Sequence, residues 1–102
     1  MDNIIIDNLE IMSQDLPDKM AWTNVNSQIQ TFGGFGWRLP YESEFKIIYD
    51  LYKLRIGNFK PKRYWSYSSY NNKAWYYDLG VGYSPHVADV NNQYYVRLVR
   101  DI

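Results

Sequence analysis

The hydrophobic period changes from helical to β-type near residue 62, and this change limits the fold more than any other feature. Before it, apolar residues recur at spacings of three and four within residues 21–30 and within a second segment opened by Leu39 and Pro40, which gives two apolar helical faces. After it come three runs of aromatic and β-branched residues that are typical of strands: residues 64–69, 74–79 and 94–100. This order predicts an α+β domain with its helices on one side of an antiparallel sheet.

Shorter signals complete the expected order of elements. Residues 4–6 and 9–12 are β-type runs split by a turn-prone Asp-Asn pair, which predicts two short strands or one strand with a bend. Residues 70–73 form a plausible hairpin turn, and one more short strand fits near residues 84–87. A chain of 102 residues has room for one core, so we expect residues 1–102 to form a single domain.

Composition excludes several classes of site. The chain has no cysteine, which rules out a disulfide framework, a thiolate zinc site and a cysteine nucleophile. Eleven Lys and Arg balance eleven Asp and Glu, so neither nucleic acid nor a membrane surface is an expected partner. No stretch approaches the roughly 18 apolar residues of a membrane span. With no secretory signal at the N-terminus, we expect a cytoplasmic protein, or an extracellular one if a signal has been trimmed.

Motifs of the chain follow the order and spacing of those of one bacterial family: Met20-Ala21-Trp22, Gly36-Trp37-Arg38-Leu39-Pro40 with Glu44-Phe45, Gly57-Asn58-Phe59 with Tyr64-Trp65-Ser66, Ala74-Trp75-Tyr76, and Tyr95-Val96-Arg97-Leu98-Val99-Arg100. The chain thereby resembles the C-type-lectin-like domains named after the C-terminal domain of a Legionella collagen-like adhesin. The resemblance implies a C-type-lectin-like fold, with two helices flanking a small twisted antiparallel sheet and paired terminal strands. It also implies kinship with the formylglycine-generating-enzyme type of lectin fold, which hosts both enzymes and binding proteins.

The motif residues are expected to build the scaffold. Arg38 and Arg97 are flanked by apolar residues, and a buried guanidinium must be paired, so each should contact Glu44, Asp78 or loop carbonyls. The four tryptophans are expected in the core and at its edge. The full scaffold set is Trp22, Trp37, Arg38, Leu39, Pro40, Glu44, Trp65, Trp75 and Arg97.

Catalytic and metal-binding constellations are not visible in the sequence. The single histidine, His86, stands in a loop without a nucleophile motif, and it cannot supply a zinc site alone. Formylglycine generation needs cysteines, which are absent. Asp89, Asn91 and Asn92 offer oxygen ligands, but a calcium site takes about six to eight of them. We therefore expect no enzyme activity, no cofactor and no metal.

Recognition in C-type-lectin-like folds is usually carried by the loops between the late strands. Those loops are rich in Tyr and Asn, the residue types that binding loops favour. The candidate ligand-binding residues are Tyr67, Tyr70, Asn71, Asn72, Tyr83, His86, Asp89, Asn91 and Asn92. The sequence thus favours a non-catalytic binding module for a protein partner, which could include a second copy in a small homo-oligomer.

A second hypothesis is a calcium-independent lectin-like domain that binds an anionic glycan. It rests on a segment with five basic and no acidic residues, which could form an anionic-ligand patch. The patch residues are Lys53, Arg55, Lys60, Lys62 and Arg63. A third hypothesis is a degenerate relative of formylglycine-generating-enzyme-type enzymes.

Overall fold

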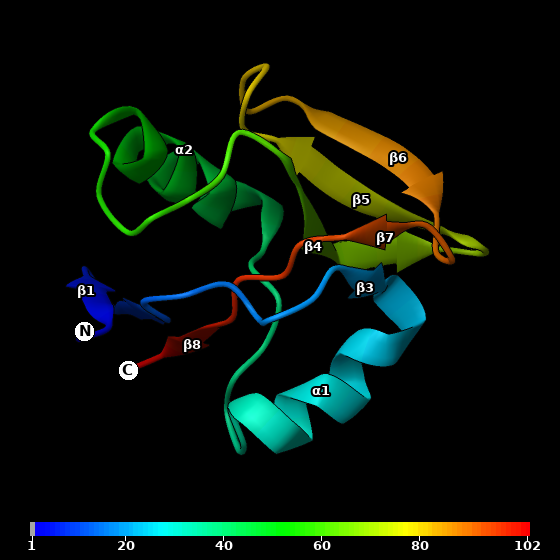
Figure 1. Cartoon of the computed structure of the whole chain (residues 1–102), viewed down its shortest axis with the longest axis horizontal. Helices are drawn as coiled ribbons and strands as arrows, with labels where there is room; N and C mark the ends of the chain where they lie inside the picture. The colour runs from blue at the N-terminus through cyan, green and yellow to red at the C-terminus, as the bar shows by residue number, and fades with distance from the viewer. Residues whose placement is uncertain (1) are drawn as a thin grey trace.

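The computed structural model describes residues 2–102 and has mixed α+β architecture (Figure 1). The elements in chain order are β1 (Ile4–Ile6), β2 (Leu9–Ile11), β3 (Met20–Ala21), the 3-10 helix η1 (Trp22–Asn24), α1 (Val25–Phe32), the 3-10 helix η2 (Glu42–Glu44), α2 (Phe45–Lys53), β4 (Arg63–Tyr70), β5 (Lys73–Asp78), β6 (Pro85–Asp89), β7 (Gln93–Tyr94) and β8 (Val99–Asp101). The predicted α+β class and its two helices are confirmed.

The strands of the described residues form three small antiparallel sheets, where one was expected. Their orders are β1-β2-β8, β3-β7 and β4-β5-β6. The terminal regions are joined through β2 and β8, while β1 pairs with β2 alone. The hairpin between β4 and β5 turns at Asn71, whose φ of 56° suits an asparagine at a tight turn. The short strand expected near residues 84–87 is β6.

Both faces of the β4-β5 hairpin are buried, and this corrects the expectation of helices on one side. Successive strand residues point to opposite faces, yet Tyr64 and Trp65 are both buried, as are Tyr76 and Tyr77. Trp65 and Tyr76 belong to a cluster with residues of α1, whereas Tyr64 and Tyr77 belong to a cluster with residues of α2. The two helices therefore cover opposite faces, in agreement with their separate positions in Figure 1.

The single strand expected over residues 94–100 is interrupted: its ends lie in β7 and β8, but residues 95–98 between them are not part of a strand. The N–H of Tyr95 donates to Arg63, whereas Val96 and Leu98 accept from residues of the loop after β2. The segment between β7 and β8 thus exchanges hydrogen bonds with two different parts of the chain, and no single neighbour gives it a continuous ladder. Its alternating apolar residues are buried because other segments surround it, so their pattern resembled that of one long strand.

Arg97 is enclosed in the interior, as predicted, but its carboxylate partner is Asp15. The Arg97 Nε donates to Asp15 Oδ1 at 2.9 Å, and Nη1 donates to the carbonyl of Met12 at 3.0 Å. The Tyr64 hydroxyl donates to the other Asp15 oxygen at 2.8 Å. Only 1% of the Arg97 side chain and 5% of the Asp15 side chain are exposed. Burial raises the pKa of Tyr64 above its ordinary value.

Membrane-spanning helices are not found among residues 2–102, since neither helix is long and apolar enough to cross a bilayer.

Candidate functional site

A groove of about 480 Å³ lies between α1 and the distal half of β4, and we call it groove A. Its volume is within the range of ligand-binding pockets. Aromatic side chains form its walls, and amide and hydroxyl groups lie between them. The lining residues are Trp22, Asn26, Ile29, Trp37, Arg38, Leu39, Tyr67, Ser68 and Ser69.

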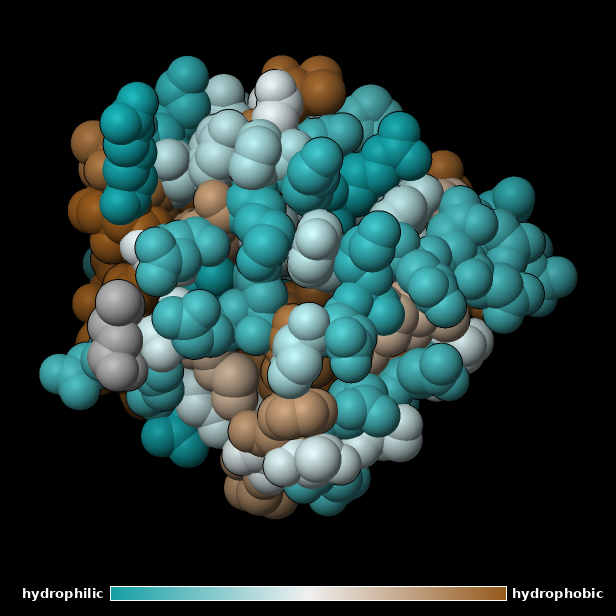
Figure 2. Space-filling model, in the orientation of Figure 1, coloured by the Kyte–Doolittle hydropathy of each residue, from teal (hydrophilic) through white to brown (hydrophobic). Residues whose placement is uncertain are grey.

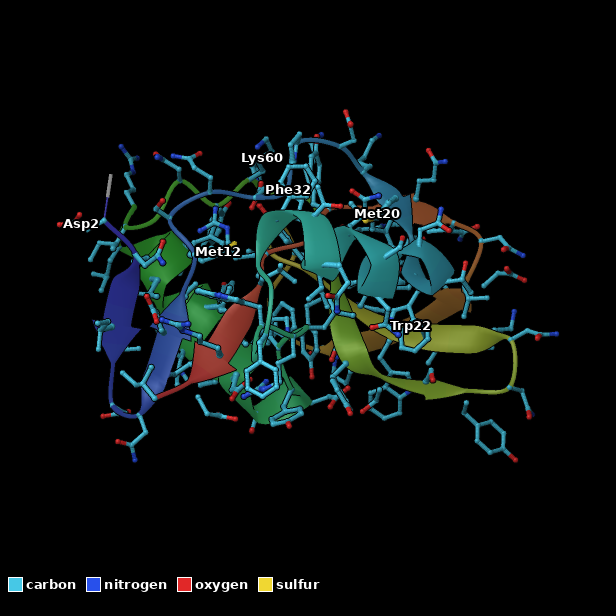
Figure 3. All side chains as sticks on the ribbon, turned by 90° about the horizontal axis from the view of Figure 1, so that it is seen from below. Asp2, Met12, Met20, Trp22, Phe32 and Lys60 are labelled. Atoms are coloured by element: carbon cyan, nitrogen blue, oxygen red, sulfur yellow. The ribbon has the colours of Figure 1, made fainter. Side chains whose placement is uncertain are left out.

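The two tryptophans of groove A are held by contacts outside the groove. Trp22 lies between the start of α1 and β4 (Figure 3), and its Nε1 donates to the carbonyl of Ser66 at 2.9 Å. Trp37 packs on Gly33, where an added Cβ would lie 2.8 Å from the Trp37 Cβ. The guanidinium of Arg100 lies over the Trp37 ring, 4.9 Å from its centroid. Both rings are therefore positioned before any ligand arrives.

The third aromatic wall is Tyr67, a predicted ligand-binding residue that is 51% exposed. Its N–H donates to the carbonyl of Pro40 at 2.8 Å, which ties β4 to the segment before η2. Its ring meets the edge of Tyr41 with centroids 5.0 Å apart. The neighbouring Ser68 hydroxyl donates to Glu42 at 2.9 Å. Tyr67 thus has a fixed backbone and an exposed ring.

Arg38 supplies one border of groove A, and its charge is matched within the protein. Two parallel hydrogen bonds of 2.9 Å join it to the Glu44 carboxylate, as predicted, and a third of 2.9 Å reaches Asp101. These hydrogen bonds, above all those that Arg38 donates to Glu44, raise the pKa of Arg38 well above its usual range. The buried Nε has no hydrogen-bond partner among the described residues. Groove A therefore offers little net charge for recognising an ion.

A second groove of about 480 Å³, groove B, is basic. It is lined by Lys19, Pro61, Lys62, Arg63, Asp78, Gln93, Tyr94 and Tyr95. The Arg63 Nη1 donates to the Tyr94 hydroxyl at 3.2 Å, and this contact is the main cause that raises the pKa of Arg63. Neither Lys19 nor Lys62 forms an ion pair with another residue of the described range.

The structure does not bring the nine predicted ligand-binding residues together. Tyr67 lines groove A, whereas the hairpin tip of β4-β5 and the adjoining β6-β7 turn hold most of the others: Tyr70, Asn71, Asn72, Asp89, Asn91 and Asn92. Tyr83 lies at the opposite end of β5-β6, 5.3 Å from the ring of Tyr49. His86 was expected in a loop, but it is the second residue of β6 and stacks on Tyr76, with ring centroids 5.3 Å apart. Whether these residues bind a ligand stays a prediction.

The five predicted patch residues are also divided. Lys62 and Arg63 line groove B, together with Lys19, which the sequence argument missed. Lys60 forms an ion pair with Asp15, in which its Nζ lies 3.0 Å from Asp15 Oδ2. Lys53 and Arg55 lie at and just beyond the end of α2. The five residues therefore lie on different parts of the surface and do not form one patch.

The four tryptophans are distributed as predicted, with one exception. Trp65 is fully buried, and Trp22 and Trp37 pack at the edge of the same cluster. Trp75 is half-buried and outside both clusters. Within residues 2–102, no three His, Asp or Glu side chains gather closely enough to hold a metal ion.

Several groove residues were missed because they carry no motif, namely Asn26, Ile29, Ser68 and Ser69. They come from segments about 40 residues apart, and only the packing of α1 beside β4 joins them.

No model of a known protein family matches the chain, and no curated protein is significantly similar to it.

Proposed function

We propose that this chain is a non-catalytic binding module that takes a protein partner in groove A. The observation that carries the proposal is the set of three preorganised aromatic walls in an open groove. Trp22, Trp37 and Tyr67 give rigid apolar area, and binding hot spots are enriched in these residue types. The charge of Arg38 is already matched, so the groove suits apolar side chains and backbone amides of a protein segment.

The scaffold that presents groove A is proposed to be of the C-type-lectin-like kind, within the adhesin-named family that the motifs resemble. Two observations support this reading. The chain termini are brought together by antiparallel pairing of β2 with β8. Two helices lie on opposite faces of a small hairpin sheet, which agrees with flanking helices.

A photo-crosslinking amino acid at position 67 tests the protein-partner proposal. We expect it to capture one defined protein from an extract of the source cell, because the Tyr67 ring forms a wall of groove A. The matched control carries the same amino acid at position 70, which is on the same strand, 75% exposed and outside the groove. Equal capture from both positions would contradict the proposal.

Groove B supports a second candidate, the calcium-independent binding of an anionic glycan. Lys19, Lys62 and Arg63 line it beside two tyrosine rings. A glycan array in calcium and again in EDTA should give the same binding, which weakens as salt screens the charges. The variant Lys62→Glu should abolish that binding, whereas Lys73→Glu, an exposed control on β5, should retain it. Binding in calcium only, or equal effects of the two variants, would contradict this candidate.

A further inference from the structure

Groove A runs along one face of the helical segment formed by η1 and α1. Its residues Trp22, Asn26 and Ile29 follow one another at spacings of four and three, so they lie on the same side of that segment. Gly33 continues the row, and Trp37 packs on it. A rise of about 1.5 Å per residue gives this row a length of about 16 Å from residue 22 to residue 33. The groove is therefore long enough for several residues of an extended chain.

The free polar side chains of groove A favour a ligand that accepts hydrogen bonds. Among residues 2–102, no group accepts from the indole N–H of Trp37, and the side chains of Asn26 and Ser69 form no hydrogen bond. All three groups are open to solvent. An indole N–H can only donate, and amide and hydroxyl groups can donate as well as accept. Since carboxylates already match the charge of Arg38, the groove suits an uncharged ligand rich in acceptors.

Two kinds of peptide are poorly suited to groove A. A partner strand needs a row of free backbone groups, but beside the groove the N–H of Tyr67 already donates to the carbonyl of Pro40. The carbonyl of Ser66 likewise already accepts from the indole of Trp22. A docked helix satisfies its own carbonyls, so it would cover the donors of groove A without pairing them, which costs free energy. The occupant that fits is an extended segment whose carbonyls are free.

A polyproline II segment meets these conditions. It has no internal hydrogen bonds, so its carbonyls are free to accept, and its prolines carry no N–H that the groove would have to pair. Proline-rich segments in this conformation dock into grooves lined by aromatic rings, and Trp22, Trp37 and Tyr67 supply such rings here. With a rise of about 3.1 Å per residue, about five residues of the segment span the groove.

An exposed phenylalanine extends the aromatic row beyond Trp37. Phe35 is 99% exposed and lies between Gly34 and Gly36, whose φ angles of 81° and 90° are left-handed values that favour glycine. It precedes Trp37 by two residues, so the two Cα atoms are at most about 7 Å apart. Figure 2 shows apolar atoms at the lower end of the molecule, where the loop after α1 lies in Figure 1. A segment that leaves groove A past Trp37 can therefore cover the Phe35 ring.

We infer, on the basis of the proposed function, that groove A binds a proline-rich segment of the partner in the polyproline II conformation, and that Phe35 contacts the same segment. Proline rings pack against the aromatic walls of the groove. The carbonyls of the segment accept hydrogen bonds from the indole of Trp37 and from the side chains of Asn26 and Ser69. The segment is already extended before it binds, so little conformational entropy is lost.

Fluorescence anisotropy with a fluorescein-labelled heptaproline peptide and the full chain tests the inference. The matched probe is a heptaalanine peptide with the same label. We expect the proline peptide to bind with a dissociation constant below about 1 mM, and the alanine peptide to bind at least tenfold more weakly. Equal binding of the two peptides would overturn the inference. If the proline peptide does not bind while crosslinking at position 67 still captures one protein, the inference fails and the proposed function stands.

Three variants locate the peptide on the surface. Phe35→Ala and Tyr67→Ala should each weaken binding of the proline peptide several-fold, whereas Tyr70→Ala, an exposed aromatic position outside the groove, should leave it unchanged. Because the Phe35 ring is fully exposed, its removal should not disturb the fold, and circular dichroism checks this for every variant. An equal effect of the three variants would overturn the inference. Unchanged binding for Phe35→Ala alone would overturn the contact assigned to Phe35.

Discussion

The two faces of the β4-β5 hairpin are closed in different ways. On the α2 face, the apolar cluster ends at Arg97, Asp15 and Tyr64, whose polar groups are bonded to one another inside the protein. On the α1 face, α1 covers Trp65 but leaves the distal half of β4 open as groove A, lined by Tyr67. The difference separates polar groups that hold the fold from aromatic groups that line an open groove.

Removal of Asp15, which lies on the closed α2 face, should cause the largest loss in the free energy of unfolding. Asp15→Ala leaves Arg97 buried without its carboxylate, and loss of one partner of a buried pair costs about 3–5 kcal/mol. Urea unfolding of the purified variant measures this cost. The conservative Asp15→Asn retains one acceptor oxygen for the Arg97 Nε–H and should lose less. A loss below about 1 kcal/mol for Asp15→Ala would show that Arg97 is not held by this pair.

Glu44→Gln, at the border of groove A, should cause an intermediate loss in the free energy of unfolding. The glutamate accepts two hydrogen bonds from Arg38 and one from the N–H of Tyr41, at 2.8 Å. Arg38 keeps its bond to Asp101, and both Arg38 and Glu44 are partly exposed. We therefore expect a loss of about 1–2 kcal/mol in urea unfolding. A loss as large as that of Asp15→Ala would contradict the expectation that the partly exposed Arg38 pair contributes less to stability than the buried Arg97 pair.

The sequence predicted much of the structure on both sides of the hairpin, but not the polar pairing on the closed α2 face. Local patterns gave the two helices, the β4-β5 hairpin and the Arg38–Glu44 pair, whose members are six residues apart. Arg97 and Asp15 are 82 residues apart, and no local pattern selects one acidic residue of the N-terminal segment over another. The same holds for groove A, because Asn26 and Ser69 become neighbours only through packing.

Tyr64 offers a pH-dependent test of the closed face. Burial raises the pKa of its folded form, so above pH 10, near the ordinary tyrosine pKa, the unfolded chain loses a proton that the folded chain keeps. This contribution to stability is present below pH 10 and falls as pH rises. Tyr64→Phe should lower the free energy of unfolding by about 1 kcal/mol at neutral pH. The difference in stability between the variant and wild type should become smaller in alkaline solution.

Melting temperatures of both proteins between pH 8 and pH 11 provide the measurement. Other tyrosines and lysines also titrate in this range, so only the difference between the two proteins is informative. A gap that stays constant across the range would show that the Tyr64 hydroxyl is not held neutral by burial.

On the open face, Tyr67→Ala should give the smallest change in stability. Its ring is about half exposed, and the main loss is an edge contact with Tyr41. We expect a loss near 0.5–1 kcal/mol in urea unfolding, by the usual size of an aromatic pair. A loss above about 2 kcal/mol would place Tyr67 in the core rather than in a binding surface.

The dissociation constant of the protein captured at position 67 tests the central claim most directly. It should be measured by isothermal titration with wild type, Tyr67→Ala and Tyr70→Ala, all confirmed as folded. The account predicts at least tenfold weaker binding for Tyr67→Ala, about 1.4 kcal/mol, and unchanged binding for Tyr70→Ala. Unchanged binding for Tyr67→Ala, with a loss for Tyr70→Ala, would place recognition at the hairpin tip and contradict groove A as the site.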